Sequence, residues 1–303
     1  MIILNDKTKI AVVALIIGQI FWGTSYILTE LALRVFPPAM LVSIRLIIAA
    51  LVLGSIAWAT GNLVRIPWRV YRWFFLASFC EPFLYFLCEA FAVQRVGSMV
   101  TSVILSFIPL LTPFLTYFFI REKITIMSLI GIVVSTIGVL MVIVERGKFT
   151  ADFLGIFFLF IAMFGAIGYA LVIRKVPDEY NTLSVVFYMF CTALVFFIPT
   201  TLLTETDQLM ALANVPSQRI VDALIHVALL AVTSSCIAFL FYSYGVRIIG
   251  PNKAAVFNNI QPAITALFVW LLSLFAFESN PMTLVKWIGI FVVIIGMFIS
   301  QKK

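Results

Sequence analysis

Three ionisable residues lie inside long apolar stretches of this 303-residue chain, namely Arg45, Glu81 and Glu89. A charged side chain at the centre of a bilayer costs roughly 2.5–3.5 kcal/mol on insertion scales, so such residues usually face a partner or a solute. Glu81, Tyr85 and Glu89 are spaced four residues apart and would share a broad face of one helix. This face is predicted to bind a cationic group or a proton. The other interpretation is a structural ion pair between Arg45 and one of the acids.

A second polar cluster lies in an apolar stretch towards the C-terminus. Asn258, Asn259 and Gln261 come just before Pro262. A proline inside a helix removes the N–H that would bond to the carbonyl four residues earlier, here that of Asn258. We expect at least one of the three amides to line a cavity. The alternative is hydrogen bonding between helices.

Aromatic residues supply the third feature. Trp22 lies deep in the first apolar stretch, and Tyr26 follows four residues later on the same helical face. An aromatic wall suits apolar, aromatic or cationic solutes, although ordinary packing explains each aromatic equally well. The predicted cavity residues are Trp22, Tyr26, Arg45, Glu81, Tyr85, Glu89, Tyr169, Tyr242, Asn258, Asn259 and Gln261. The predicted helix kinks are at Pro82, Pro109, Pro113 and Pro262.

Composition determines the kind of element that carries these residues. The hydrophobic set makes up 63% of the chain, only 11% is charged, and the mean hydropathy is +1.16. Soluble domains carry about 25% charged residues, and a soluble globule of this size lacks the polar surface to cover so much apolar area. Cytosolic enzymes, secreted domains and disordered proteins are therefore excluded. No P-loop, HExxH or GxSxG motif occurs, which argues against direct use of ATP and against a hydrolase.

Ten apolar stretches predict ten transmembrane helices. They span residues 10–29, 39–59, 71–92, 98–119, 124–144, 153–174, 182–203, 221–243, 253–276 and 284–300. If the N-terminus is cytoplasmic, 13 of the 20 Lys and Arg residues fall inside, 6 fall outside, and Arg45 lies within a span. We therefore expect both termini in the cytoplasm. Compact loops and the lack of an organellar targeting segment favour a bacterial plasma (inner) membrane.

An internal repeat divides the chain into two parts. A shift of 153 residues places Gly97 on Gly250 and Pro109 on Pro262, and it also pairs Glu81 with Ser234 and Glu89 with Tyr242. We expect two five-helix halves, residues 1–145 and 150–303. Five is odd, so the halves would enter the membrane in opposite senses, as in transporters that alternate access around a midplane site. The alternative is chance similarity between apolar segments.

The ends of the two halves resemble a known family. Trp22-Gly23 and a pattern of Gly, central Pro, Glu and Gly-x6-Gly are similar to the EamA branch of the drug/metabolite transporter superfamily. The matching residues are Gly97, Pro109, Glu122, Gly131 and Gly138, then Gly250, Pro262, Glu278, Gly289 and Gly296. The resemblance implies a ten-helix exporter of metabolites, amino acids or drugs. It also implies a cavity lined mainly by the first, third, fourth, sixth, eighth and ninth helices.

The number of charged residues within the apolar stretches restricts the class of solute. Phosphorylated solutes would require several intramembrane cations, and only Arg45 is available. Arg45 and Glu81 together complement an amino acid, which carries both charges. The leading hypothesis is a secondary transporter that exports amino acids or similar small metabolites by alternating access. The alternative is a proton-coupled exporter of cationic or aromatic drugs, and proton exchange and downhill uniport both remain open. Expected partners are a small-molecule substrate, the lipid bilayer and protons, with no nucleic acid, cofactor or metal, in a monomer or homodimer.

Overall fold

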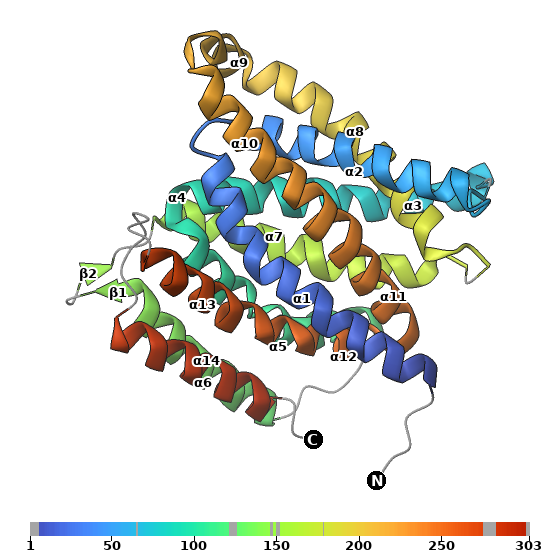
Figure 1. The fold of residues 1–303 in the computed structure, drawn as a ribbon. Coiled ribbons are helices and arrows are strands. Elements are labelled where there is room, and N and C mark those ends of the chain that lie inside the picture. The colour runs from blue at the N-terminus through green and yellow to red at the C-terminus, as the bar shows by residue number, and fades with distance from the viewer. Residues whose placement is uncertain are drawn as a thin grey trace.

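The computed structural model describes residues 6–64, 66–120, 126–145, 148–149, 152–177, 179–274 and 283–300. These residues are almost entirely helical (Figure 1). The exception is a two-residue ribbon in which β1 (Val144–Glu145) pairs antiparallel with β2 (Lys148–Phe149). Glu122 and Glu278 of the repeat pattern lie outside the described residues.

Every apolar stretch of the sequence contains a described helix. The N-terminal part comprises α1 (Asp6–Ala32), α2 (Pro38–Ala59), α3 (Trp68–Ser78), a π-helical segment (Phe79–Leu84), α4 (Tyr85–Leu105), α5 (Ile108–Ile120) and α6 (Ile126–Ile143). The C-terminal part begins with α7 (Phe153–Val172), a 3-10 turn (Ile173–Lys175), α8 (Thr182–Thr204), α9 (Thr206–Ala211), a second 3-10 turn (Leu212–Asn214) and α10 (Ser217–Leu229). It continues with a π-helical segment (Leu230–Ala238), α11 (Phe239–Ile249), α12 (Pro251–Ala255), a 3-10 segment (Val256–Ile260), α13 (Gln261–Ser273) and α14 (Leu284–Ser300).

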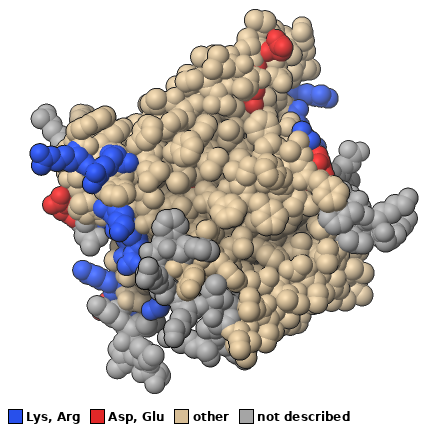
Figure 2. All heavy atoms as spheres, turned by 180° about the vertical axis from the view of Figure 1, so that it is seen from behind, with Lys and Arg blue, Asp and Glu red and all other residues tan. Residues whose placement is uncertain are grey.

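The outer surface is suited to lipid. Seven helical segments are long and apolar enough to cross a membrane, and shorter apolar helices cover Leu129–Ile143 and Leu284–Gly296. Large apolar side chains such as Leu51 and Phe291 are about two-thirds exposed. Figure 2 shows a broad uncharged middle, with charged side chains gathered towards the two sides. The protein is therefore a multi-pass membrane protein.

The helices α6 and α14 pack closely because small residues face each other. A Cβ atom on Gly138 would lie 2.6 Å from the carbonyl oxygen of Gly289. One on Gly296 would lie 2.7 Å from the carbonyl oxygen of Gly131. The four glycines of the repeat pattern therefore meet at one contact, where the two backbones approach without side chains between them.

The third helical stretch of each part is interrupted in the middle. In the first, Pro82 lies within the π-helical segment that separates α3 from α4. In the second, a longer π-helical segment separates α10 from α11. Each stretch later reaches a glycine with positive φ, +79° at Gly97 and +86° at Gly250. Only glycine adopts this conformation readily, so the matched positions both turn the chain.

The remaining prolines have different local roles. Pro109 and Pro262 lie in the first turns of α5 and α13, where a missing N–H leaves no helical bond unmade. The irregular segments therefore precede these two prolines. Pro113 lies within α5.

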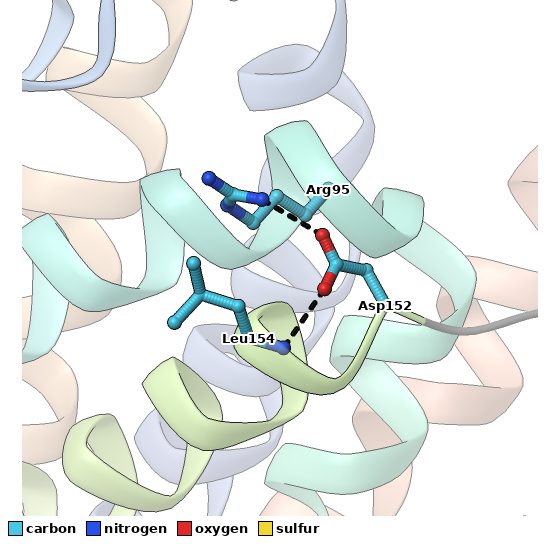
Figure 3. Close-up of polar contacts among 3 residues, drawn as sticks. All are labelled: Arg95, Asp152 and Leu154. Carbon is cyan, nitrogen blue, oxygen red and sulfur yellow. Dashed lines mark hydrogen bonds and ion pairs between the residues drawn. The ribbon is translucent and has the colours of Figure 1, made fainter.

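Asp152 joins the middle of α4, two residues before Gly97, to the start of α7 (Figure 3). One carboxylate oxygen accepts the backbone N–H of Leu154 at 2.8 Å and so caps α7. The other accepts a hydrogen bond from Arg95 Nη1 at 2.8 Å. The Arg95 hydrogen bond, followed by that of Leu154, lowers the pKa of Asp152 from its ordinary value.

Replacing Gly138 with Leu should destabilise the protein by about 1–3 kcal/mol, because the new side chain would overlap the backbone of α14. The measurement is the apparent Tm of purified protein in detergent. Ile137→Leu is the control, since Ile137 is 52% exposed on the same helix. Equal Tm values for the two variants would contradict the close glycine contact.

Replacing Asp152 with Asn should lower the apparent Tm at pH 7, and the difference from the parent should shrink as the pH falls below the ordinary aspartate pKa of about 3.9. A carboxyl whose pKa is lowered by folding stabilises the protein above its unfolded pKa of about 3.9, and loses this effect as the pH falls through the folded pKa. Asp6→Asn is the control, because Asp6 pairs only with Lys9 on the exposed start of α1. A Tm difference independent of pH would contradict the assignment.

Candidate functional site

A small polar pocket lies where both π-helical segments approach α1, α2 and α13. Its lining residues are Trp22, Ser25, Tyr26, Arg45, Glu81, Tyr85, Phe86, Glu89, Ile108, Ala166, Ser234, Tyr242, Asn258 and Gln261. The cavity volume is about 20 Å³, which is room for about one water molecule. The pocket therefore gathers buried polar groups from distant parts of the chain around a small space.

Arg45 is held by the π-helical segment between α10 and α11. Its side chain is 2% exposed, and Nε and Nη2 donate to the hydroxyls of Ser235 and Ser234 at 2.6 and 2.7 Å. Its guanidinium carbon lies 4.1 Å from the ring centroid of Phe86, within the range of a cation–π contact. Both serines lie in this one irregular segment, so Arg45 joins α2 to the C-terminal half of the chain.

Glu81 and Glu89 also line the pocket, and each is 3% exposed. Among the described residues, neither carboxyl has an ion pair within 4.0 Å or a hydrogen bond to a protein group. The structural ion pair with Arg45 is therefore not formed in this conformation. An unpaired buried carboxylate is costly, so each group is stable only when protonated or when satisfied from the cavity.

The backbone at Glu81 explains how both acids reach one pocket. Glu81 is extended, with φ −152° and ψ 123°, inside the π-helical segment. Regular helical spacing predicted that Glu81 shares a face with Tyr85 and Glu89. Because the backbone of Glu81 is not helical, this spacing does not determine where its side chain lies. The three side chains still converge, because the break lies beside the cavity. Interruptions of this kind occur frequently at functional sites.

A chain of amides links α1 to the irregular start of α13. The Tyr26 hydroxyl donates to Gln261 Oε1 at 2.6 Å, and Gln261 Nε2 donates to Gln19 Oε1 at 2.5 Å. Gln19 Nε2 in turn donates to Asn258 Oδ1 at 2.8 Å. Asn258 and Gln261 thus line the cavity and also bond between helices, so both interpretations of the amide cluster hold for them.

Two predicted cavity residues lie elsewhere. Asn259 is buried, does not line the pocket, and has no partner for its side-chain atoms within the described part of the chain. Tyr169 is fully buried, and its hydroxyl shares a 2.6 Å hydrogen bond with Ser243. The amide and aromatic patterns alone did not distinguish these two residues from those that face the cavity.

The aromatic wall is built from both parts of the chain. Trp22 Nε1 donates to the carbonyl of Ser234 at 3.2 Å, and its ring lies 4.9 Å from that of Tyr242. Ser25 and Phe86 complete this side of the pocket without having been predicted. Ser234 was recognisable as the repeat counterpart of Glu81, but a serine in an apolar stretch carries little signal by itself.

The sequence model of the EamA-like transporter family matches residues 9–144 and again residues 153–301, so the chain belongs to that family. The family comprises transporters rather than enzymes.

Several curated relatives are also transporters. The uncharacterized transporter YetK of Bacillus subtilis is 23% identical over 75% of this chain and 66% of its own length. The uncharacterized transporter YyaM of the same organism is 24% identical over 66% of this chain and 63% of its own length. The match thus spans slightly less than two thirds of each of these relatives. An uncharacterized transporter of Archaeoglobus fulgidus is 21% identical over 93% of this chain and 95% of its own length.

A solved crystal structure has the same fold. It covers 96% of both chains with a TM-score of 0.67, at 17% sequence identity. The likeness at this level of identity concerns the fold alone.

Replacing Gln19 with Leu should destabilise the protein by about 1–2 kcal/mol, because Asn258 Oδ1 and Gln261 Nε2 would both lose their partner. The apparent Tm in detergent measures the effect. Thr24→Val is the control, since Thr24 bonds only to the Phe21 carbonyl of its own helix. If Gln19→Leu and Asn258→Leu have additive effects on Tm, the two side chains are not coupled.

Proposed function

We propose that this protein is a secondary transporter that exports amino acids or similar small metabolites across a bacterial plasma membrane. The proposal rests on one observation: two buried carboxyls, which have no hydrogen-bond or ion-pair partner among the described residues, share a pocket with one anchored guanidinium. An amino acid carries an ammonium for the carboxyls and a carboxylate for Arg45. Each buried charge would then gain the partner that it lacks in the closed pocket.

The chain architecture supports alternating access as the mechanism. The family matches the chain twice, and each half has an irregular third helical stretch beside the pocket. We propose two five-helix halves, residues 1–145 and 150–303, that cross the membrane ten times in opposite senses with both termini in the cytoplasm. Rocking of the halves would expose the pocket to one side of the membrane and then to the other.

The size of the pocket indicates what must move. With room for about one water molecule, it is too small for an amino acid in this conformation. Admission of solute requires the lining helices to separate. The contacts of Arg45 with Ser234 and Ser235, and of Trp22 with the Ser234 carbonyl, link the two halves and would be exchanged for contacts with solute.

The second candidate function is proton-coupled export of cationic or aromatic drugs. Two carboxyls face one guanidinium whose Nε and Nη2 are already bonded to serines. The wall contains Trp22, Phe86 and Tyr242, which favour a cationic or aromatic solute. In this case Glu81 or Glu89 would exchange a proton for the drug, and Arg45 would serve only to hold the π-helical segment.

Replacing Glu81 with Gln should abolish export while leaving the protein in the membrane, because the amide cannot neutralise an ammonium. The measurement is mass-spectrometric profiling of the medium from cells that express the parent or the variant at equal membrane abundance. A metabolite that accumulates only with the parent identifies the solute. Glu179→Gln is the control, since Glu179 is exposed in a turn away from the pocket. Undiminished export by Glu81→Gln would refute the role of Glu81.

Arg45→Gln separates the two functions in proteoliposomes. A parent that transports a cationic dye but no amino acid, together with an Arg45→Gln variant that still transports the dye, would favour the drug exporter. A parent that catalyses amino-acid counterflow but no dye transport, together with a variant that has lost counterflow, would favour the metabolite exporter.

A further inference from the structure

A groove separate from the polar pocket runs between α3 and α7. It is lined by Trp73, Leu76 and Cys80 on one side, and by Gly168, Leu171, Val172, Arg174 and Lys175 on the other. Its cavity volume is about 660 Å³, far larger than that of the central pocket. It involves no residue of that pocket, so it requires a different occupant.

The chemistry of the groove changes along its length. Gly168, Leu171 and Val172 belong to α7, and the two cations follow in the 3-10 turn that ends this helical stretch. At a helical rise of 1.5 Å per residue, the lining from Gly168 to Lys175 extends about 10 Å, with its apolar residues at one end and its cations at the other. Trp73 lies midway along α3, one residue after Arg72. Tryptophan is enriched where a membrane meets water. The groove thus matches an amphiphile with an anionic head and an apolar chain.

The two cations of the groove can contact an anionic headgroup. Arg174 and Lys175 are exposed, and neither forms an ion pair with a described residue. Arg72 adds a third cation beside the groove, with its guanidinium carbon 5.0 Å from the Trp73 ring centroid. Arg69 and Arg72 line an adjoining hollow on α3. Figure 2 shows most of the Lys and Arg side chains of that face at one edge of the molecule, with a smaller group at the opposite edge.

We propose that this groove binds one anionic phospholipid, with its phosphate at Arg174 and Lys175 and an acyl chain along Leu76 and Leu171 towards Cys80. Basic pockets between transmembrane helices are a recognised basis for binding anionic headgroups. The apolar floor distinguishes this site from a simple basic surface, because it holds a chain as well as a head. Cys80 directly precedes Glu81, so the bound chain would contact the π-helical segment that also serves the central pocket. The site does not depend on which solute is transported.

Native mass spectrometry of the delipidated full-length protein in detergent tests the proposal. The probes are phosphatidylglycerol and phosphatidylcholine with identical acyl chains, supplied in equal amounts. The parent should retain one phosphatidylglycerol in preference. Arg174→Gln with Lys175→Gln should weaken that binding by about fivefold for each cation, hence about 25-fold in all. Lys7→Gln with Lys253→Gln is the matched control, because it removes the same charge outside the groove and should change binding less than twofold.

Two further measurements separate a lipid site from a phosphate site. Leu76→Trp fills the groove while keeping every cation, and it should reduce retention of phosphatidylglycerol. Glycerol phosphate, which has the head without the chain, should not displace the bound lipid. The proposal is overturned if the two lipids are retained equally, or if the matched double variants behave alike. It is also overturned if Leu76→Trp binds as the parent does, or if glycerol phosphate competes.

Discussion

The contact of Arg45 with Ser234 and Ser235 is the interaction on which the centre of this structure depends. A guanidinium in an apolar environment must find acceptors, and here they come from the opposite half of the chain. Neutral hydroxyls satisfy its donors without cancelling its charge. Glu81 and Glu89 are consequently left without a salt-bridge partner in the same pocket. The proposed role of this pocket in binding a solute rests on this arrangement of one anchored cation and two acids, neither of which forms a salt bridge among the described residues.

The same constraint accounts for the irregular helices. A regular helix bonds all its own backbone groups and has none to offer to a neighbour. In the π-helical segment between α10 and α11, the Ser234 carbonyl accepts from Trp22 Nε1 as well as from the backbone N–H of Phe239. The break between α3 and α4 places Glu81 in the cavity. Backbone irregularity in a membrane protein is tolerated where it faces protein or a polar cavity, and these breaks meet that condition.

Outside the centre, the bundle is held by packing. The contact between α6 and α14 has glycine backbones in van der Waals range, and large apolar side chains cover the outward surface. Without a hydrophobic driving force between helices in lipid, close approach of small residues supplies the attraction. Polar side chains thus determine the contacts between helices at the centre, and small residues provide the attraction between helices at the periphery. The basic groove between α3 and α7 lies outside both the central pocket and the contact of α6 with α14. A lipid from the surrounding bilayer therefore fits this groove better than a transported solute.

Much of this follows from the sequence alone. Long apolar stretches predict membrane helices because each must bury its own backbone bonds, and the repeat identified the glycines that meet between α6 and α14. Polar residues are rare in membrane helices, because transfer of a polar group into lipid costs free energy. This rarity identified five candidate residues, namely Arg45, Glu81, Glu89, Asn258 and Gln261. Only the tertiary structure decided which neighbours these side chains have. Arg45 bonds to serines rather than to acids, and Glu81 reaches the pocket through a non-helical backbone. Tyr169 and Asn259 do not line the pocket. These outcomes depend on the rotation and breaks of helices far apart in the chain, and periodicity within one helix contains no information about them.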